Sequence, residues 1–141
     1  MLNAYFMAAS PEFCPNVPPR ARAMSIRALR LDRTGPRQAK SKQPWPLVLS
    51  LSEKVDFRSV APDAFTFSTL DDAGWTEVVL KTPPVYDDQA VPPTITLALP
   101  SLPTTVWQIL ARGTGARPIV DAAGRRLGGG EDFVYIETIE N

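Results

Sequence analysis

Residues 112–130 read Arg-Gly-Thr-Gly-Ala-Arg-Pro-Ile-Val-Asp-Ala-Ala-Gly-Arg-Arg-Leu-Gly-Gly-Gly, and two β-rich runs, 105–111 and 132–139, flank them. Two sets of glycines bracket a short apolar centre in this stretch. The order Asp-Ala-Ala-Gly at 121–124 is typical of a type I turn, with Asp first and Gly last. The stretch therefore predicts the end of one strand, a small ribbon that turns at 121–124, and a closing strand.

The segment 47–141 consists of short runs in which apolar and polar residues alternate, the period expected of half-buried strands. Ile95, Leu97 and Leu99 show this pattern clearly. No run of ten residues within 47–141 carries a consistent apolar stripe at helical spacing. About seven strands at intervals of roughly 8–12 residues predict an all-β, antiparallel β-sandwich. The expected strands cover residues 47–52, 54–60, 65–68, 75–81, 94–99, 105–111 and 132–139.

The alternation also predicts which side chains face the core. In 105–111, the set that contains Trp107 and Ile109 is preferred to the set of Val106 and Leu110, because it buries more apolar area. In 132–139, apolar residues fall on both faces, which predicts burial of both faces over the first half of that strand.

Charge divides the chain into two parts. Residues 1–45 hold eight Lys/Arg and two Asp/Glu, a net charge of +6, whereas residues 46–141 hold seven and thirteen, a net charge of −6. Positive charge and frequent proline keep a chain extended and solvated. We therefore expect a disordered, basic, Pro-rich arm at 1–46 and a β-sandwich domain at 47–141. Either Met1 or Met24 fits as the start of the chain.

The run 24–33, Met-Ser-Ile-Arg-Ala-Leu-Arg-Leu-Asp-Arg, fits two structures. Ile26, Leu29 and Arg33 have helical spacing, whereas Leu29 and Leu31 have the spacing of a strand. A loosely held arm or an edge strand is the simpler interpretation. The alternative is a basic contact with an acidic partner or a membrane surface.

Composition excludes several kinds of chemistry. Histidine is absent and Cys14 is the single cysteine, so Ser–His and Cys–His catalysis, zinc clusters and internal disulfides are excluded. No nucleophile–base pair can be assembled from the remaining residues, and we expect no enzymatic activity and no cofactor. The acidic domain lacks the basic footprint of a nucleic-acid binder. No apolar run approaches the ~20 residues of a membrane span.

Two blocks near the end of the chain carry a family resemblance. The block Trp-Gln-Ile-Leu-Ala-Arg-Gly-Thr-Gly at 107–115, followed by Pro-Ile-Val-Asp-Ala-Ala-Gly-Arg-Arg-Leu at 118–127, resembles the end of bacterial Ig-like domains of extracellular and surface proteins. In those domains a strand leads into an I-x-D-x-x-G-x-x-L turn, and the matching residues here are Ile119, Asp121, Gly124 and Leu127.

The resemblance covers residues 92–139 and implies an Ig-like β-sandwich with a surface or extracellular location. Domains of this family usually stand in tandem arrays behind an export signal. Here residues 1–10 lack the basic start of a secretory signal, which favours a cytoplasmic location instead.

Trp45, Trp75 and Tyr86 are the candidate contact residues. Exposed aromatic side chains stack on sugar rings and form hot spots in protein interfaces. Trp75 shares a strand face with Glu77 and Lys81, which predicts that it is exposed. Packing inside the domain is the simpler interpretation of the three aromatics.

Glycine and acidic clusters have structural interpretations as well. The glycines of 113–115 and 128–130 lack the following helix and the Lys-Ser/Thr ending of a phosphate-binding loop, which favours turn glycines. The acids at 71–72, 87–88 and Asp121 would suit calcium or a glycosidase pair if they converged. We expect solvated turn acids and no bound metal.

These observations predict a non-catalytic structural or protein-interaction module with an Ig-like fold. One alternative is a carbohydrate-binding module that uses exposed aromatics. Another is an accessory component of a phage or secretion particle, tethered by the basic arm. The sequence leaves open which protein or glycan is bound.

Overall fold

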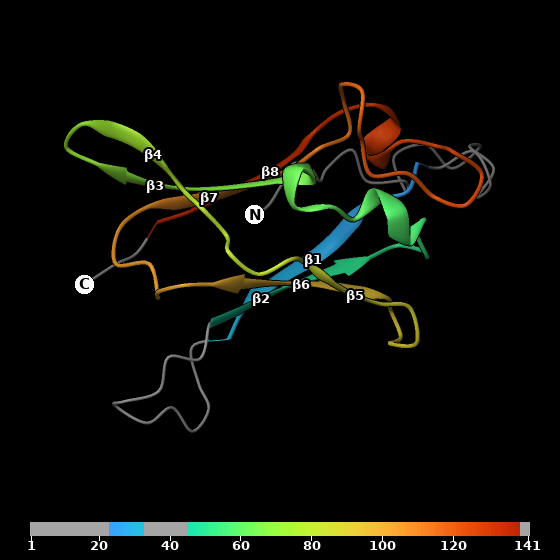
Figure 1. The fold of residues 1–141 in the computed structure, drawn as a ribbon, viewed down its shortest axis with the longest axis horizontal. Coiled ribbons are helices and arrows are strands. Elements are labelled where there is room, and N and C mark those ends of the chain that lie inside the picture. The colour runs from blue at the N-terminus through green and yellow to red at the C-terminus, as the bar shows by residue number, and fades with distance from the viewer. Residues whose placement is uncertain (1–22, 33–44, 139–141) are drawn as a thin grey trace, which may run out of the picture.

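The computed structural model of the 141-residue chain describes residues 23–32 and 45–138. Two antiparallel four-stranded sheets pack face to face as a β-sandwich (Figure 1). The described residues form strands, turns and three short 3-10 turns, with no α-helix among them. The all-β sandwich expected from the alternating sequence is therefore confirmed. No described helix has the length and hydropathy needed to span a membrane.

The first sheet has the strand order β1-β2-β6-β5 and the second has the order β4-β3-β7-β8. All neighbouring strands are antiparallel. The first sheet comprises β1 (Ile26–Leu31), β2 (Trp45–Leu51), β6 (Thr94–Leu99) and β5 (Val85–Asp87). The second comprises β4 (Gly74–Val78), β3 (Phe65–Asp71), β7 (Trp107–Ala111) and β8 (Phe133–Glu137). The 3-10 turns cover Phe57–Ser59, Pro62–Ala64 and Leu127–Gly129.

The core lies between the sheets and is built from one face of each strand. Trp107 is fully buried, and its ring centroid lies 5.6 Å from that of Phe67 and 5.7 Å from that of Tyr135. Burying each large apolar side chain contributes about 1.5–3 kcal/mol. The predicted inward face of β7 is confirmed. The fully buried large side chains include Leu47, Leu49, Leu51, Ile95, Leu97, Leu99, Ile109, Ile119 and Leu127.

The predicted boundary between an arm at 1–46 and a domain at 47–141 is wrong for the described part of that arm. Met24 is fully buried in the core, and its carbonyl accepts a hydrogen bond of 2.8 Å from the Gly128 amide. Strand β1 pairs with β2, which itself begins at Trp45. Residues 26–31 form a strand at the edge of the first sheet, so the edge-strand interpretation of 24–33 is confirmed. The expected disorder of 1–22 and 33–44 lies outside the described residues.

This correction has a physical reason. Met24 packs in the core, whereas Arg27 and Arg30 of the same segment are exposed at the sheet edge. The polar and basic neighbours of Met24 give this segment the composition of a solvated arm, so the sequence does not indicate that Met24 is buried. A deletion that tests the basic arm as a tether must therefore end before Met24. Removal of residues 1–45 would remove β1 and part of the core.

Two strand assignments also differ from the sequence prediction. In 54–60, Val55 makes only an isolated bridge to Asp121, and Phe57 starts a 3-10 turn with its side chain 70% exposed. The Asp56 side chain accepts from the Arg58 amide, and this cap favours the turn over an extended strand. Residues 82–93 lie between two expected strands, and the structure places there the short strand β5, which pairs with β6.

The last strand is buried on one face only, so the predicted burial of both faces is wrong. Val134 and Ile136 are 50% and 53% exposed. They project from the side of the second sheet that faces away from the first sheet. The sandwich has two layers among the described residues, so no third layer covers these side chains.

The turn expected at 121–124 is confirmed. The Gly124 amide donates to the Asp121 carbonyl at 3.0 Å, and Val120 bridges to Arg126 as a minimal ribbon. Gly124 has φ +81°, which favours glycine because it lacks a Cβ atom. Gly113 is required for a different reason, since a Cβ atom there would overlap the carbonyl oxygens of Leu127 and Glu131. The opening stretch thus forms the packed end of the sandwich.

Candidate functional site

The candidate site is the side of the second sheet that faces away from the core, here called the outer face. Its exposed apolar side chains come from β3, β4 and β8. Leu70 pairs in register with Trp75, and their exposed fractions are 36% and 45%. Leu110 of β7 pairs in register with the exposed Val134. The outer face comprises Thr66, Ser68, Leu70, Trp75, Glu77, Gln108, Leu110, Val134 and Ile136.

A polar row crosses the middle of the outer face. Ser68 of β3 lies opposite Glu77 on β4 and opposite Gln108 on β7. The row ends at Gln108, which lies opposite the apolar Ile136 of β8. Ser68 is only 5% exposed, because the neighbouring strands flank its short side chain. Apolar side chains therefore lie on both sides of a row that offers a hydroxyl, an amide and one carboxylate.

The three predicted contact residues do not form one platform. Trp75 lies on β4 in the second sheet, whereas Trp45 on β2 and Tyr86 on β5 belong to the first sheet. Trp45 and Tyr86 are partly buried and pack against the core. The Tyr86 hydroxyl accepts a hydrogen bond of 2.9 Å from the Val55 amide. Trp75 alone is an exposed aromatic of the candidate set, as its polar strand face predicted.

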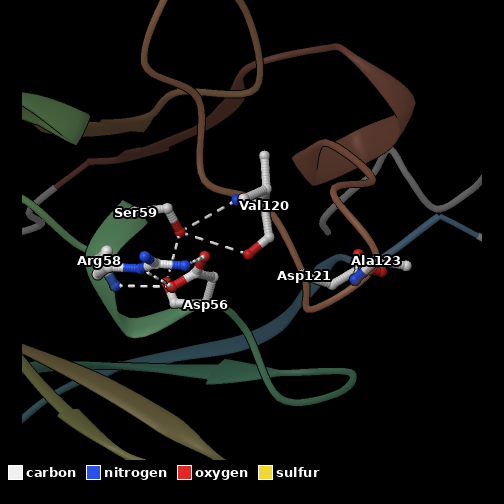
Figure 2. Close-up of polar contacts among 6 residues, drawn as sticks. All are labelled: Asp56, Arg58, Ser59, Val120, Asp121 and Ala123. Atoms are coloured by element: carbon white, nitrogen blue, oxygen red, sulfur yellow. Dashed lines mark hydrogen bonds and ion pairs between the residues drawn. The ribbon is translucent and has the colours of Figure 1, made fainter.

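A polar cluster ties together the loops at one end of the sandwich, and Figure 2 shows part of it. The Asp121 carboxylate accepts from the backbone amides of Ala123 and Arg125, both at 2.9 Å, and from the Arg125 Nε at 2.7 Å. Asp121 is 4% exposed. Arg125 also contacts Glu53 at 3.3 Å, so the turn is joined to the loop after β2.

The protonation of this cluster follows from its contacts. Burial alone would raise the pKa of Asp121, but hydrogen bonds from Arg125, Glu53 and Ala123 hold it below its usual value. Burial raises the pKa of Glu53, the hydrogen bond to Asp121 raises it further, and the charge of Arg125 opposes both. Asp121 is therefore the carboxylate that stays charged and holds the turn.

Ser59 links two loops beside this cluster (Figure 2). Its hydroxyl donates to the Asp56 carbonyl at 2.7 Å and accepts from the Val120 amide at 3.1 Å. Asp56 also pairs with Arg58, which lowers the pKa of this carboxyl chiefly through their side-chain hydrogen bond. The hydroxyl thus joins the 3-10 turn after β2 to the ribbon before Asp121.

Asp132 makes a second loop contact. Its carboxylate accepts from the amides of Gly113 and Thr114 at 2.8 and 3.1 Å and from the Thr114 hydroxyl at 2.8 Å. Burial alone would raise the pKa of Asp132, but these hydrogen bonds and the charge of Arg112 lower it. The contact joins the chain just after β7 to the residue just before β8.

These polar contacts hold loops of the protein together. Asp121, Asp132 and Ser59 already bind backbone groups of the protein. Within the described ranges, no group of three or more Cys, Asp or Glu side chains is placed to hold a metal ion. The acids at 71–72, 87–88 and 121 therefore do not converge as a calcium site would require.

Sequence reasoning missed Asp132 and the apolar outer face. The Asp132 contact spans 18 residues to Thr114, and the turn signal of the sequence does not reach that far. The outer face had a signal, the run Phe-Val-Tyr-Ile at 133–136, but it was interpreted as burial on both faces.

Comparison with known proteins supports the fold. No protein-family model matches the chain, and no significant match is found among curated proteins. Among solved structures, the N-terminal part of the bacterial S-layer protein SbsC is similar, with a TM-score of 0.51 and 15% sequence identity. The match covers 84% of this chain but 24% of the S-layer chain, so this chain spans about a quarter of that structure. At this identity the similarity shows a β-rich fold and nothing further.

Proposed function

We propose that this protein is a non-catalytic, Ig-like structural or interaction module that binds a protein partner through the outer face of β4-β3-β7-β8. The observation that carries the proposal is the exposure of Trp75, Val134 and Ile136 on one face of one sheet. Trp75 lies on one edge strand of this sheet and Val134 and Ile136 on the other, with Leu70 and Leu110 on the two strands between them. Exposed apolar side chains on one face are typical of surfaces that bind a partner.

The chemistry of the face indicates what kind of surface it would bind. Tryptophan is enriched among the residues that dominate binding energy in protein interfaces. Ser68 and Gln108 supply hydrogen-bonding groups in the middle of the face, and Glu77 is its one charged residue. A flat, largely apolar partner surface with hydrogen-bonding groups at its centre would complement it.

Two further observations support a non-catalytic role. The sequence contains no histidine, and the buried carboxylate of Asp121 accepts the hydrogen bonds that hold a turn.

The Ig-like resemblance of 92–139, together with a β-rich neighbour from an S-layer protein, supports a surface or extracellular location. Fractionation of the source cells would test that location directly.

The experiment compares partner binding by the wild type and by a double variant, Val134→Lys with Ile136→Lys. Both side chains are exposed, so the variant is expected to fold as the wild type does. The partner is first captured by crosslinking in the source cells, then purified for titration. We expect the double variant to weaken binding at least ~10-fold, the effect of ~1.4 kcal/mol.

Val91→Lys serves as the matched control, because Val91 is 98% exposed and lies in the loop after β5. This variant is expected to bind as the wild type does. Equal affinity of the double variant and the control would exclude the outer face as the contact surface.

A carbohydrate-binding role is the second candidate, and the exposure of Trp75 favours it. An indole ring can stack on the apolar face of a sugar ring, while Glu77 beside it on the same face can accept hydroxyl hydrogen bonds. The test is retention on immobilised glycans by the wild type and by Trp75→Ala. Retention that disappears in the variant would support this role, and absence of any retention would exclude it.

A further inference from the structure

Strand β4 is an exposed edge of the second sheet. It pairs with β3 on one side, and no described strand pairs with it on the other. Trp75, Thr76 and Glu77 are all exposed, although successive residues point to opposite faces of the sheet. In Figure 1 the β3–β4 hairpin projects beyond the rest of the sandwich. Both faces and the outer edge of β4 are therefore accessible.

The edges of the first sheet carry features that discourage pairing with another chain. Strand β1 contains an irregular register between Ile26 and Ala28 and exposes Arg27 and Arg30. Strand β5 is only three residues long, and a pair of prolines precedes it. Bulges, basic side chains, prolines and short length all protect sheet edges. Strand β4 has five residues, Gly-Trp-Thr-Glu-Val, with a continuous register and none of these features.

The backbone of β4 offers hydrogen-bonding groups at this edge. The β3–β4 turn has two residues and is closed by the pair Asp71 and Gly74. Such a turn is closed by a hydrogen-bonded pair, and the pairs of an antiparallel ladder then alternate. The alternation directs the backbone N–H and C=O groups of Trp75 and Glu77 away from β3.

The sequence of β4 complements itself in one antiparallel register. When two copies of β4 pair antiparallel about a two-fold axis and continue the sheet, residues opposite each other must point to the same face. The axis must therefore pass beside a residue, because an axis between two residues would place neighbours of opposite orientation opposite each other. Centring on Thr76 alone pairs all five residues, with Trp75 opposite Glu77 of the other copy. Centring on Glu77 would oppose two like charges, which is unfavourable.

The acids of the hairpin favour the same arrangement. Asp71 ends β3 and Asp72 lies in the turn before β4. In an antiparallel pair centred on Thr76, the acids of one copy lie beyond the far end of the other β4, away from the acids of that copy. The centred register therefore combines full pairing with separated like charges.

We propose that the outer edge of β4 binds β4 of a second copy of this chain, antiparallel and centred on Thr76. The pair would join the two second sheets into one eight-stranded sheet. The association is isologous and closed, because both copies use the same surface. It goes beyond the proposed function and does not depend on it, since it uses backbone groups at the edge of β4, whereas the proposed partner contact uses exposed side chains across the whole outer face.

Sedimentation velocity of the full chain over a range of concentrations tests the proposal with two variants of one residue. Glu77→Pro removes the backbone N–H of residue 77, which points away from β3, and it leaves the hydrogen bonds between β3 and β4 intact. Proline is tolerated at such positions of edge strands. Glu77→Ala keeps that N–H. We expect the wild type and Glu77→Ala to approach twice the monomer mass as concentration rises, and Glu77→Pro to remain monomeric. Thermal unfolding verifies that Glu77→Pro is folded.

Disulfide trapping tests the register independently. In a background with Cys14→Ser, Thr76→Cys places each new thiol opposite its own copy, within the Cα separation of about 4.4–6.8 Å that a disulfide needs. Ala73→Cys is the control, because residue 73 does not face itself in this register. Mild oxidation should trap a covalent dimer of the Thr76→Cys variant at least ~10-fold faster than of the control.

Three outcomes would overturn the proposal: a wild type that is monomeric at all concentrations, a Glu77→Pro variant that still dimerises, and equal trapping at residues 73 and 76. Loss of partner binding by the outer-face lysines with normal dimerisation would affect the proposed function alone. The two claims can therefore fail separately.

Discussion

Replacement of Asp121 with alanine is expected to destabilise the domain through the turn at 121–125. The carboxylate accepts hydrogen bonds from two backbone amides, those of Ala123 and Arg125, and it is 4% exposed. Both hydrogen bonds are partly buried, and a donor that loses its acceptor in such a place costs about 1–3 kcal/mol. The ion pair with Arg125 adds less than ~1 kcal/mol, because that side chain is 46% exposed.

The two amides together give an expected loss of about 2–6 kcal/mol, a large part of the roughly 5–15 kcal/mol that stabilises a typical domain. Urea unfolding followed by tryptophan fluorescence measures it, since Trp107 lies in the core. Asp87→Ala is the matched control. Asp87 also accepts from two backbone amides, those of Gln89 and Ala90, but it is exposed, so its replacement should cost less than ~1 kcal/mol. Equal losses for the two variants would refute the role assigned to the buried Asp121.

Three further predictions test other parts of the structure. Met24→Ala should cost about 2–5 kcal/mol in urea unfolding, because it empties a buried site, whereas Val91→Ala should be neutral. Gly113→Ala should lower the thermal midpoint more than Gly115→Ala, because a Cβ at 113 meets backbone while 115 has open space and only the cost of a positive φ; the reverse order would contradict the packing. The folded-state pKa of Asp132 is lowered, so its contribution to stability is present above its unfolded pKa of about 4 and is lost as pH falls through the folded value. The decrease in the urea midpoint from pH 7 to pH 3 should therefore be smaller for Asp132→Asn than for the wild type. An equal decrease in both proteins would exclude this linkage.

Much of the sandwich follows from local pattern. Strict alternation fixes β6 through Ile95, Leu97 and Leu99, and the turn at 121–124 follows from Asp and Gly at its ends. In β7, the choice of Trp107 as an inward residue rests on apolar area, which decides the face when both have apolar residues. These features depend on neighbours within a few residues, and the sequence contains that information.

Features that depend on distant partners could not be predicted in the same way. The hydrogen bonds of Asp132 reach Gly113 and Thr114 across the last part of the chain. Met24 is buried because the 127–129 turn lies against it, although its sequence neighbours are polar and basic. Strand β5 is short and follows two prolines, so it has no clear alternation of its own.

The candidate site was predicted in part. The polar neighbours of Trp75 predicted its exposure, but the grouping of Trp75 with Tyr86 and Trp45 required knowledge of which sheet each strand joins. Exposure of Ile136 depends on the number of layers in the fold. An apolar residue on the second face of a strand has the same sequence signature whether a third layer covers it or a partner does.

The central claim, that the outer face is the contact surface, is tested most directly by site-specific photo-crosslinking in the source cells. A photoreactive amino acid replaces Ile136 on the outer face or, as the control, the loop residue Val91, which is more exposed. We expect a discrete crosslinked partner from position 136 and none from position 91. No adduct from position 136, or the same adducts from both positions, would contradict the claim.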